Sequence, residues 1–241
     1  MKRVIVIPAR YGSTRLPGKP LREIAGKPLI QWVYERARES SLADEVMVAT
    51  DDGRIHDACA AFGAQVVMTS PDCKSGTDRV YEAVKGRPAD IVVNVQGDEP
   101  LIRGDMIDQL FSAIEQDSLD MATLCAYLSD RHEYTDPHTV KVVMDKKGFA
   151  LYFSRAAIPF MQRTIAIPLY KHIGIYGYSR NYLEAFVGMP KGGLEEAESL
   201  EQLRAMEAGV RIRTILVDYE GFGVDTESDL ERMHAILAAP T

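Results

Sequence analysis

The sequence has no apolar run that approaches the ~20 residues of a membrane-spanning helix, so we expect no membrane partner. It also lacks the apolar core and cleavage site of a signal peptide, because Met1–Arg3 leads directly into a strand pattern. Only three cysteines occur, widely spaced and without a CxxC pair, which indicates free thiols in a reducing compartment. Together these features predict a cytoplasmic protein.

The sequence also has fewer positively charged than negatively charged residues. The 28 lysines and arginines stand against 35 aspartates and glutamates, and the formal net charge of −7 disfavours a general nucleic-acid-binding protein. No internal repeat, low-complexity tract or flexible linker divides the 241 residues, of which 46% are hydrophobic and 26% charged. That composition is typical of globular proteins. We interpret residues 1–241 as one domain in which residues 130–190 form a subsidiary lobe.

Apolar strand patterns alternate with helical patterns along the chain. This alternation predicts an α/β fold with a mostly parallel central sheet and helices on both faces. The expected strands are 4–7, 45–49, 65–68, 91–96, 121–128, 139–144, 151–153, 171–178 and 211–217. The expected helices are 28–37, 54–62, 78–85, 106–114, 181–187, 194–209 and 227–237. Residues 142–144 and 151–153 are expected to pair as a hairpin.

Several helix ends carry residues that cap or stop helices. Thr77 and Thr226 are candidate N-caps, and Asp229 lies three residues after Thr226, as in a capping box with Asp in place of Glu. Apolar residues at helical spacing over 194–206 predict a single helix that ends near Gly209.

Two stretches have no regular pattern. The polar segment 129–137 predicts a loop with a short helical turn. The segment 158–169 is irregular, and its exposed apolar piece at 158–161 indicates a partner surface. Together with the strand 171–178, this piece suggests a two-fold homodimer.

The clearest functional pattern lies in residues 4–21. Val4–Ile7 is continuously apolar and β-branched, as in a strand buried on both faces, and we expect Pro8 to end it because proline has no N–H for a sheet ladder. Neither the GxGxxG nor the Walker phosphate-binding pattern follows. The loop instead combines two glycines and two hydroxyls with three cations, Arg10, Arg15 and Lys19. Glycine lets backbone N–H groups approach a ligand and cations neutralise phosphate, so the loop predicts a polyphosphate clamp. The alternative is an ordinary solvated loop.

Two aspartates lie where a ligand can reach them. Asp98 follows the strand pattern 91–96, and ligands of α/β sheets bind outside the carboxyl ends of parallel strands. Magnesium takes one or two carboxylates together with substrate phosphates, so Asp98 is a natural magnesium ligand beside a phosphate clamp. A turn aspartate is the alternative for Asp98, since Asp-Glu-Pro favours turns. Asp225 precedes the helix 227–237 and has its own alternative, a charge that meets the helix dipole.

A resemblance to a known family enters at this loop. It rests on the pattern Pro8-Ala9-Arg10-x-x-Ser13-x-Arg15-Leu16-x-x-Lys19-Pro20-Leu21. The pattern resembles the nucleotide-binding loop of sugar-acid cytidylyltransferases, most closely the 3-deoxy-manno-octulosonate (KDO) cytidylyltransferases. Further matches include Gln96-Gly97-Asp98-Glu99-Pro100 and Gly223-Val224-Asp225-Thr226, so the resemblance covers nearly the whole chain. It implies a Rossmann-like nucleotidyltransferase fold and a homodimer. It also implies a reaction of CTP with KDO to CMP-KDO and pyrophosphate, for lipopolysaccharide biosynthesis.

The resemblance also implies a role for each matching residue. Nucleotidyl transfer would be carried out by Arg10, Arg15, Lys19, Asp98 and Asp225. CTP would be bound by Pro8, Ala9, Arg10, Ser13, Arg15, Lys19, Ser75, Gly76, Arg79, Gln96 and Asp98. Asp98 and Asp225 would hold Mg²⁺, the expected cofactor. Little covalent work would remain for the protein, because positioning and charge neutralisation carry such reactions.

The sugar acid would be bound by Gln96, Arg155, His172, Tyr176, Glu201 and Gln202. Arg155 suits the carboxylate, because a guanidinium group can bind it through two parallel hydrogen bonds, and the other side chains suit hydroxyls. Structural alternatives are a strand aromatic for Tyr176 and solvated helix positions for Glu201 and Gln202. The segment 162–169 matches no family motif and leaves the shape of the sugar pocket open.

Two other functions stay open on the sequence alone. One is the same chemistry on another sugar acid, such as an amino-substituted KDO or a sialic acid. The other is a non-catalytic nucleotide-binding regulator. The intact Asp98 and Asp225 count against the regulator.

Overall fold

The structure is a computed structural model that describes residues 1–13, 15–128, 130–163 and 166–238. The chain divides into two compact units, Met1–Asp108 with Gly221–Thr241, and Gln109–Glu220. The division falls within helix α4 (Gly104–Asp117). The second unit contains the whole of the predicted lobe 130–190 and extends beyond it on both sides.

The first unit is built on a parallel sheet. Its strands are β1 (Arg3–Ala9), β4 (Glu45–Thr50), β5 (Gln65–Met68) and β6 (Ile91–Asn94). They lie in the order β6-β1-β4-β5, and every adjacent pair is parallel. The β-branched run of β1 is at most 1% exposed, because the central strand is covered on both faces.

Strand β1 does not end at Pro8, contrary to the sequence-based prediction. Its ladder with β6 stops at Val6, but its ladder with β4 continues through Pro8 to Ala9. Past Val6 the strand has one neighbour instead of two, so a residue without an N–H can continue it.

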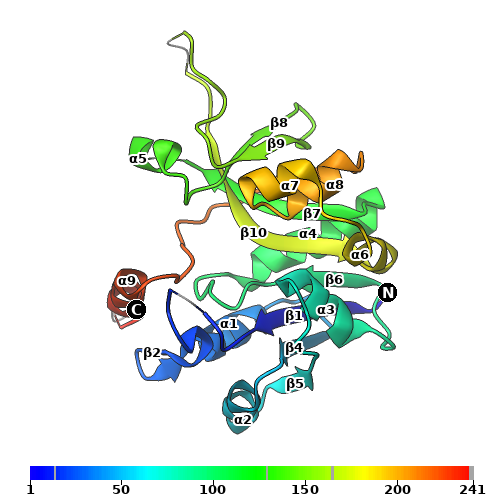
Figure 1. Cartoon of the computed structure of the whole chain (residues 1–241), viewed down its shortest axis with the longest axis vertical. Helices are drawn as coiled ribbons and strands as arrows, with labels where there is room; N and C mark the ends of the chain where they lie inside the picture. Colours follow the sequence, from blue (N-terminus) through cyan, green and yellow to red (C-terminus); the bar gives the residue numbers. More distant parts are fainter. Residues whose placement is uncertain (14, 129, 164–165, 239–241) are drawn as a thin grey trace. The chain divides into compact units, whose positions relative to one another are not determined.

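Three helices flank this sheet: α1 (Leu29–Ala37), α2 (Gly53–Ala61) and α3 (Gly76–Val84) (Figure 1). Leu29, Val33 and Ala37 of α1 are fully buried, at the i, i+4 and i+8 spacing expected from the sequence. Between β1 and α1 lie the short 3₁₀ helix η1 (Lys19–Leu21) and the hairpin of β2 (Glu23–Ile24) with β3 (Lys27–Pro28).

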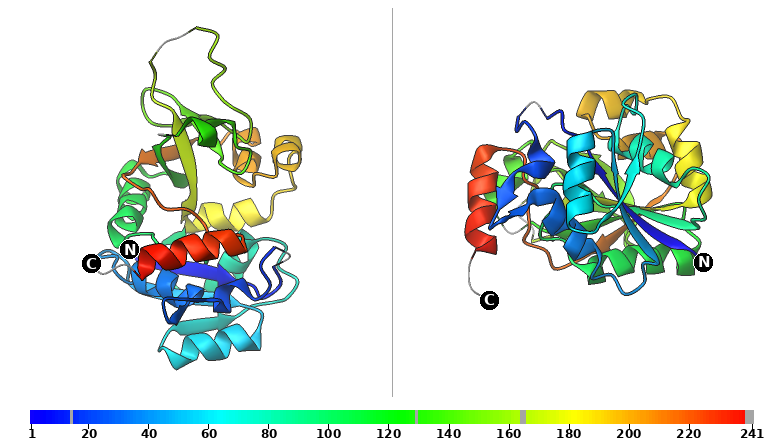
Figure 2. Two further views of the ribbon diagram at one scale, coloured as in Figure 1. Left: turned by 90° about the vertical axis from the view of Figure 1, so that its left-hand side faces the viewer. Right: turned by 90° about the horizontal axis from the view of Figure 1, so that it is seen from below.

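The C-terminal helix α9 (Glu227–Leu237) completes the first unit and lies beside the β2–β3 hairpin (Figure 2). Thr226 caps it, and Asp229 closes the capping box, as predicted. Leu230 and Met233 pack in one apolar cluster with Leu16 of the phosphate loop and Val224. The cluster therefore connects the end of the chain to the loop after β1.

The strands of the second unit pair in both parallel and antiparallel directions. Strand β7 (Met121–Tyr127) is parallel to β11 (Ile212–Leu216) and antiparallel to β10 (Tyr170–Ser179). The predicted hairpin is confirmed as β8 (Lys141–Met144) and β9 (Ala150–Ser154), and β8 also pairs with β10. The short helix α5 (Arg131–Thr135) is the helical turn expected in 129–137, of which Ser129 lies outside the described residues.

The single helix predicted over 194–209 is wrong. The structure has α7 (Gly193–Glu198) and α8 (Gln202–Glu207), after α6 (Arg180–Val187). Ser199 separates them with a left-handed backbone, φ 51°. The carbonyl oxygens of Glu198 and Ser199 accept hydrogen bonds from Arg155 instead of continuing a helical ladder.

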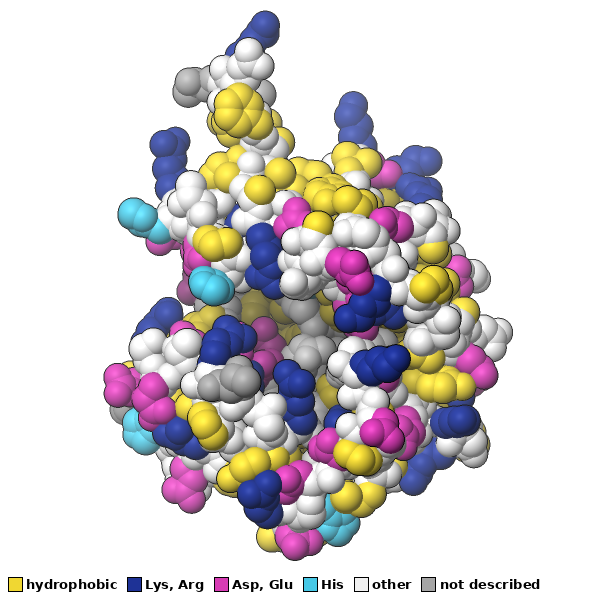
Figure 3. All heavy atoms as spheres, viewed as in Figure 1, with side chains coloured by type: hydrophobic (Ala, Val, Ile, Leu, Met, Phe, Trp, Pro, Cys, Tyr) yellow, Lys and Arg dark blue, Asp and Glu magenta, His cyan; other side chains and the backbone are white. Residues whose placement is uncertain are grey.

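Between β9 and β10 the described residues 155–163 and 166–169 form no helix or strand, as expected; Thr164 and Ile165 lie outside the described residues. Hydrophobic side chains are exposed along this segment (Figure 3), with Phe160 85% exposed and Met161 37%. In the described part of the chain, no helix has the length and apolar character needed to span a membrane.

Candidate functional site

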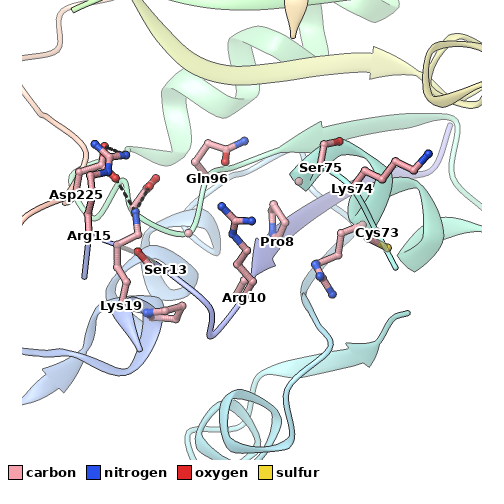
Figure 4. Close-up of a pocket in the computed structure, with 16 residues that line it drawn as sticks. Pro8, Arg10, Ser13, Arg15, Lys19, Cys73, Lys74, Ser75, Gln96 and Asp225 are labelled. Carbon is pink, nitrogen blue, oxygen red and sulfur yellow. Dashed lines mark hydrogen bonds and ion pairs between the residues drawn. The ribbon is translucent and has the colours of Figure 1, made fainter. Parts of the chain in front are cut away.

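A cavity of about 410 Å³ lies in the first unit, at the carboxyl ends of β1 and β6 (Figure 4). Because the two strands are parallel neighbours, the residues that follow them emerge at the same edge of the sheet. The cavity is lined by Pro8, Ala9, Arg10, Ser13, Arg15, Lys19, Pro20, Cys73, Lys74, Ser75, Gly76, Arg79, Gln96, Gly97, Asp98 and Asp225. Every residue predicted to bind CTP is in this lining.

The loop after β1 is held in shape by its own contacts. Gly18 adopts φ +64°, and its N–H donates to the carbonyl oxygen of Tyr11. A Cβ at Gly18 would lie 3.2 Å from the Tyr11 ring, so both backbone and space favour glycine. The guanidinium carbon of Arg54 stacks 3.3 Å from the centre of the same ring, which ties the loop to α2.

Lys19 lies between the two aspartates that the sequence singled out. Its Nζ is 2.6 Å from Oδ2 of Asp98 and 3.0 Å from Oδ1 of Asp225 (Figure 4). Arg15 reaches the other oxygen of Asp225 at 3.1 Å. The structure thus brings together four of the five residues predicted to be catalytic in one network of charge-assisted hydrogen bonds.

The network shifts the pKa of two of its members. Burial alone would lower the pKa of Lys19, but Asp98 and Asp225 raise it above its usual value. Burial would raise the pKa of Asp225, but the hydrogen bond and charge of Lys19, with Arg15, lower it below its usual value. Both groups are therefore charged at neutral pH.

Arg10 points into the cavity between Gln96 and Pro8 (Figure 4). It makes no ion pair or hydrogen bond with any residue that the structure describes. Its charge is therefore available to an anionic ligand in the cavity, whereas Arg15 and Lys19 already pair with carboxylates.

On the opposite side of the cavity, Ser75 is the N-cap of helix α3. Its hydroxyl accepts from the N–H of Asp78, whose side chain closes a capping box, so the N-cap is Ser75 rather than the predicted Thr77. Arg79 is 4% exposed, and its guanidinium donates to Thr69 Oγ1 and to Asp51 Oδ2. These contacts fix Arg79 in the wall, and its predicted contact with CTP stays a prediction.

Asn94 is a site-supporting residue that the sequence analysis did not single out. It is 1% exposed, and its Oδ1 accepts a 3.1 Å hydrogen bond from Nε2 of Gln96. That bond turns the other amide atom, Oε1 of Gln96, towards Gly76. A polar residue two positions before Gln96 in an otherwise apolar strand was the available signal, because strand residues two apart share a face.

Cys73 also lines the cavity, which the sequence analysis did not predict. Its thiol donates to a carboxylate oxygen of Glu82 at 3.0 Å. Burial, together with this hydrogen bond, raises the pKa of Cys73 to about 12, so the thiol stays protonated and is a poor nucleophile.

Of the residues predicted to bind a sugar acid, all except Gln96 lie in the second unit. The rings of His172 and Tyr176 are 5.4 Å apart on β10, where Gly174 and Ile175 bulge out of the ladder with β7. Nε2 of His172 lies 3.0 Å from Oγ1 of Thr123. Burial lowers the pKa of His172 to about 3, so its ring is neutral at pH 7 and suits hydroxyls rather than a carboxylate.

Glu201 and Gln202 lie at the start of α8, near the same rings. Burial raises the pKa of Tyr176 well above its usual value, and the charge of Glu201 adds to this rise. Gln202 is 3% exposed, which rules out the solvated helix position considered from the sequence. Its buried Nε2 has no hydrogen-bond partner among the described residues, as expected of a group that a ligand satisfies.

Arg155 has structural partners that the sequence did not indicate. Its guanidinium donates to the carbonyl oxygens of Glu198 at 2.8 Å, Pro137 at 2.9 Å and Ser199 at 3.4 Å. Its own carbonyl accepts a hydrogen bond from the fully buried Lys141. These bonds join three segments of the second unit, and the predicted contact of Arg155 with a sugar carboxylate stays a prediction.

The described residues hold no cluster of three or more His, Cys, Asp or Glu side chains placed for a metal ion. Asp98 and Asp225 form a pair of carboxylates. One or two carboxylates are the protein ligands of a magnesium site that phosphates and water complete. The donor set therefore fits magnesium bound together with a phosphate ligand.

Comparison with known proteins adds to this geometry. Residues 4–212 match the family model described as cytidylyltransferase. The chain is 49% identical to a 3-deoxy-manno-octulosonate cytidylyltransferase of Thermodesulfovibrio yellowstonii, over 96% of each chain. It is 47% identical to an 8-amino-3,8-dideoxy-manno-octulosonate cytidylyltransferase of Shewanella frigidimarina, over 99% of each chain.

A solved structure is equally similar. It is a CMP:2-keto-3-deoxy-manno-octonic acid synthetase complexed with CTP, with a TM-score of 0.95, 49% sequence identity and coverage of 99% of each chain. This likeness confirms the α/β fold class predicted from the sequence.

Proposed function

The chain belongs to the cytidylyltransferase family, and we propose that it joins CTP to KDO, forming CMP-KDO and pyrophosphate. The observation that carries this proposal is the cavity in which three cations of one loop meet two carboxylates from distant parts of the chain. Relatives of nearly equal length with the name of this activity support it.

The reaction exchanges one bond to phosphorus for another. The anomeric hydroxyl of KDO attacks the α-phosphorus of CTP, the bond to the bridging oxygen of the β-phosphate breaks, and pyrophosphate leaves. The proton of the hydroxyl passes to water. Arg10, Arg15 and Lys19 bind the β- and γ-phosphates and neutralise the charge that develops on the leaving group.

Asp98 and Asp225 would hold Mg²⁺. When bound, the ion neutralises phosphate charge and lowers the pKa of the attacking hydroxyl. The protein contributes a carboxylate pair that is in contact with Lys19 and Arg15 and lies beside the phosphate-binding loop.

KDO is bound by neutral and acidic side chains that suit hydroxyls: His172, Tyr176, Glu201 and Gln202. Nε2 of Gln202, which has no hydrogen-bond partner in the described part of the chain, supports this assignment because a sugar hydroxyl would satisfy it. Gln96, at the CTP cavity, is the remaining candidate for the sugar acid.

An 8-amino-substituted KDO is a second candidate acceptor, favoured by a relative that is 47% identical over 99% of each chain. The test is pyrophosphate release with CTP and KDO, 8-amino-KDO or a sialic acid, using Asp98→Asn as the inactive control. We expect release with KDO that depends on both substrates. A higher kcat/KM for 8-amino-KDO than for KDO would show that 8-amino-KDO is the substrate. CTP binding without release from any of the three acids would identify a non-catalytic regulator.

We also propose a pathway, a cellular compartment and an oligomeric state for the protein. CMP-KDO formation places the protein in lipopolysaccharide biosynthesis, in the cytoplasm, and the exposed apolar residues of the second unit support a homodimer. The free thiols Cys59, Cys73 and Cys125 are consistent with a reducing compartment.

A further inference from the structure

The two carboxylates proposed to hold magnesium are already occupied by a cation of the protein itself. Nζ of Lys19 donates to both Asp98 and Asp225, and its side chain is only 17% exposed. Arg15 pairs with the second oxygen of Asp225. A divalent ion cannot bind both carboxylates until Lys19 leaves them.

The charges of the four paired groups, two carboxylates and two cations, balance one another. Asp98 and Asp225 face Lys19 and Arg15, and Arg10 adds a further cation to the same cavity. A metal ion that entered alone would leave excess positive charge and would displace Lys19 without offering it a new partner. A metal ion that entered with a triphosphate would bring net negative charge and phosphate oxygens that can accept the Lys19 donors.

The backbone of Lys19 is fixed while its side chain can move. Its N–H donates to the carbonyl of Leu16, the next turn closes from Leu21 to Gly18, and Leu16 and Pro20 are buried. Lysine carries its charge on a flexible four-carbon stem with rotatable donors. An exchange of partners therefore needs only side-chain rotation.

We propose that Lys19 is an internal counter-ion that occupies the Asp98–Asp225 pair until nucleotide arrives, then transfers to phosphate oxygens as the metal takes its place. The inference rests on the proposed function only in assigning the metal to these carboxylates. Its consequence is a coupling free energy between two ligands: Mg²⁺ and CTP each strengthen the binding of the other, and Mg²⁺ alone binds weakly.

The test is calorimetric titration of Mg²⁺ into nucleotide-free protein. In Lys19→Met we expect Mg²⁺ to bind at least about tenfold more tightly than in the wild type, because the competing charge-assisted bonds are gone. Lys19→Gln, a second variant that keeps a polar side chain, should behave alike. Lys19→Arg, which keeps the cation, should retain weak binding. Lys27→Met is the matched control, since Lys27 pairs with Glu35 at 2.6 Å outside the cavity.

Two further readouts do not depend on turnover. Mg²⁺ alone should raise the melting temperature of Lys19→Met but not that of the wild type, because a ligand stabilises the state it binds. The ratio of Mg²⁺ affinities with and without a non-hydrolysable CTP analogue should fall in the variant.

Unchanged or weaker Mg²⁺ binding in nucleotide-free Lys19→Met and Lys19→Gln would overturn the proposal, as would tight binding in Lys19→Arg. Failure of the proposed function would appear separately, as no pyrophosphate release from any sugar acid by the wild type. These outcomes are distinguishable because the metal titrations contain no sugar.

Discussion

The backbone N–H of Val224 donates a 2.9 Å hydrogen bond to the backbone carbonyl oxygen of Asp98. This bond joins the segment before α9 to the loop after β6, and it places the following residue, Asp225, beside the same ammonium group as Asp98. The side chain of Val224 is fully buried in the cluster with Leu16. The carboxylate pair is therefore positioned by backbone and core contacts, before any ligand is bound.

Replacing one carboxylate of this pair should abolish most of the activity. We expect Asp98→Asn to lower kcat by at least about a hundredfold, because a strong electrostatic stabiliser is lost, and a chelator to stop turnover of the wild type. The measurement is pyrophosphate release at saturating Mg²⁺. Asp57→Asn, at a carboxylate whose side chain is 83% exposed, is the control. A kcat close to wild type in Asp98→Asn would contradict the metal assignment.

Arg10 is a cavity cation without a partner among the described residues, so removing it should separate binding from stability. We expect Arg10→Ala to raise KM for CTP by about tenfold or more, because a charge-assisted contact with phosphate is lost. The melting temperature should stay unchanged. Arg36→Ala, at an exposed ion pair with Glu39, should change neither quantity. An unchanged KM for CTP in Arg10→Ala would show that Arg10 is not part of the clamp.

The exposed apolar residues of the second unit predict a homodimer. Phe160 is 85% exposed, and Leu151 is 60% exposed. We expect the mass of a dimer by light scattering at micromolar concentration, and a shift towards monomer in Phe160→Glu, because a charge in an apolar interface is costly. Met68→Glu changes an exposed apolar residue of the first unit and serves as the control. A monomer mass for the wild type over this range would refute the prediction.

The sequence predicted those helices and strands whose ends depend on residues close to them in the chain. Helix α9 was predicted with its capping box because Thr226 and Asp229 are three residues apart. The break at Ser199 was not predicted, because its left-handed backbone accompanies hydrogen bonds to Arg155, 44 positions away. Tertiary contacts of this kind leave no periodic signal in the sequence.

The same distinction holds at the site. The loop with Arg10, Arg15 and Lys19 was predicted as a group, because the three residues follow one strand. That Lys19 would bridge Asp98 and Asp225 could not be predicted, since the partners are 79 and 206 positions away. The carbonyl partners of Arg155 are distant as well, and no residue type marks a carbonyl acceptor.

The buried ring of His172 predicts a pH-dependent stability. Burial lowers its pKa from 6.5 to about 3. Between these values the unfolded chain binds a proton that the folded protein does not, so stability falls as the pH drops, by up to about 1.4 kcal/mol per pH unit. We expect the urea midpoint to fall less from pH 7 to pH 5 in His172→Gln than in the wild type. An equal pH dependence of the urea midpoint in His172→Gln and in the wild type would contradict the assignment.

Substitution of Arg155 distinguishes a structural role of this side chain from a sugar-binding role. Its guanidinium joins the carbonyls of Pro137, Glu198 and Ser199, and hydrogen bonds to a charged group contribute about 1.5–3 kcal/mol each. We therefore expect Arg155→Ala to lower the melting temperature by about 5 °C or more, with unchanged CTP affinity by calorimetry. Arg155→Lys should recover only part of the loss, because an ammonium group cannot span three acceptors. A selective rise in KM for the sugar acid at an unchanged melting temperature would instead establish the carboxylate contact implied by the family resemblance. Both effects together would mean that the three carbonyls hold the guanidinium where the acid binds.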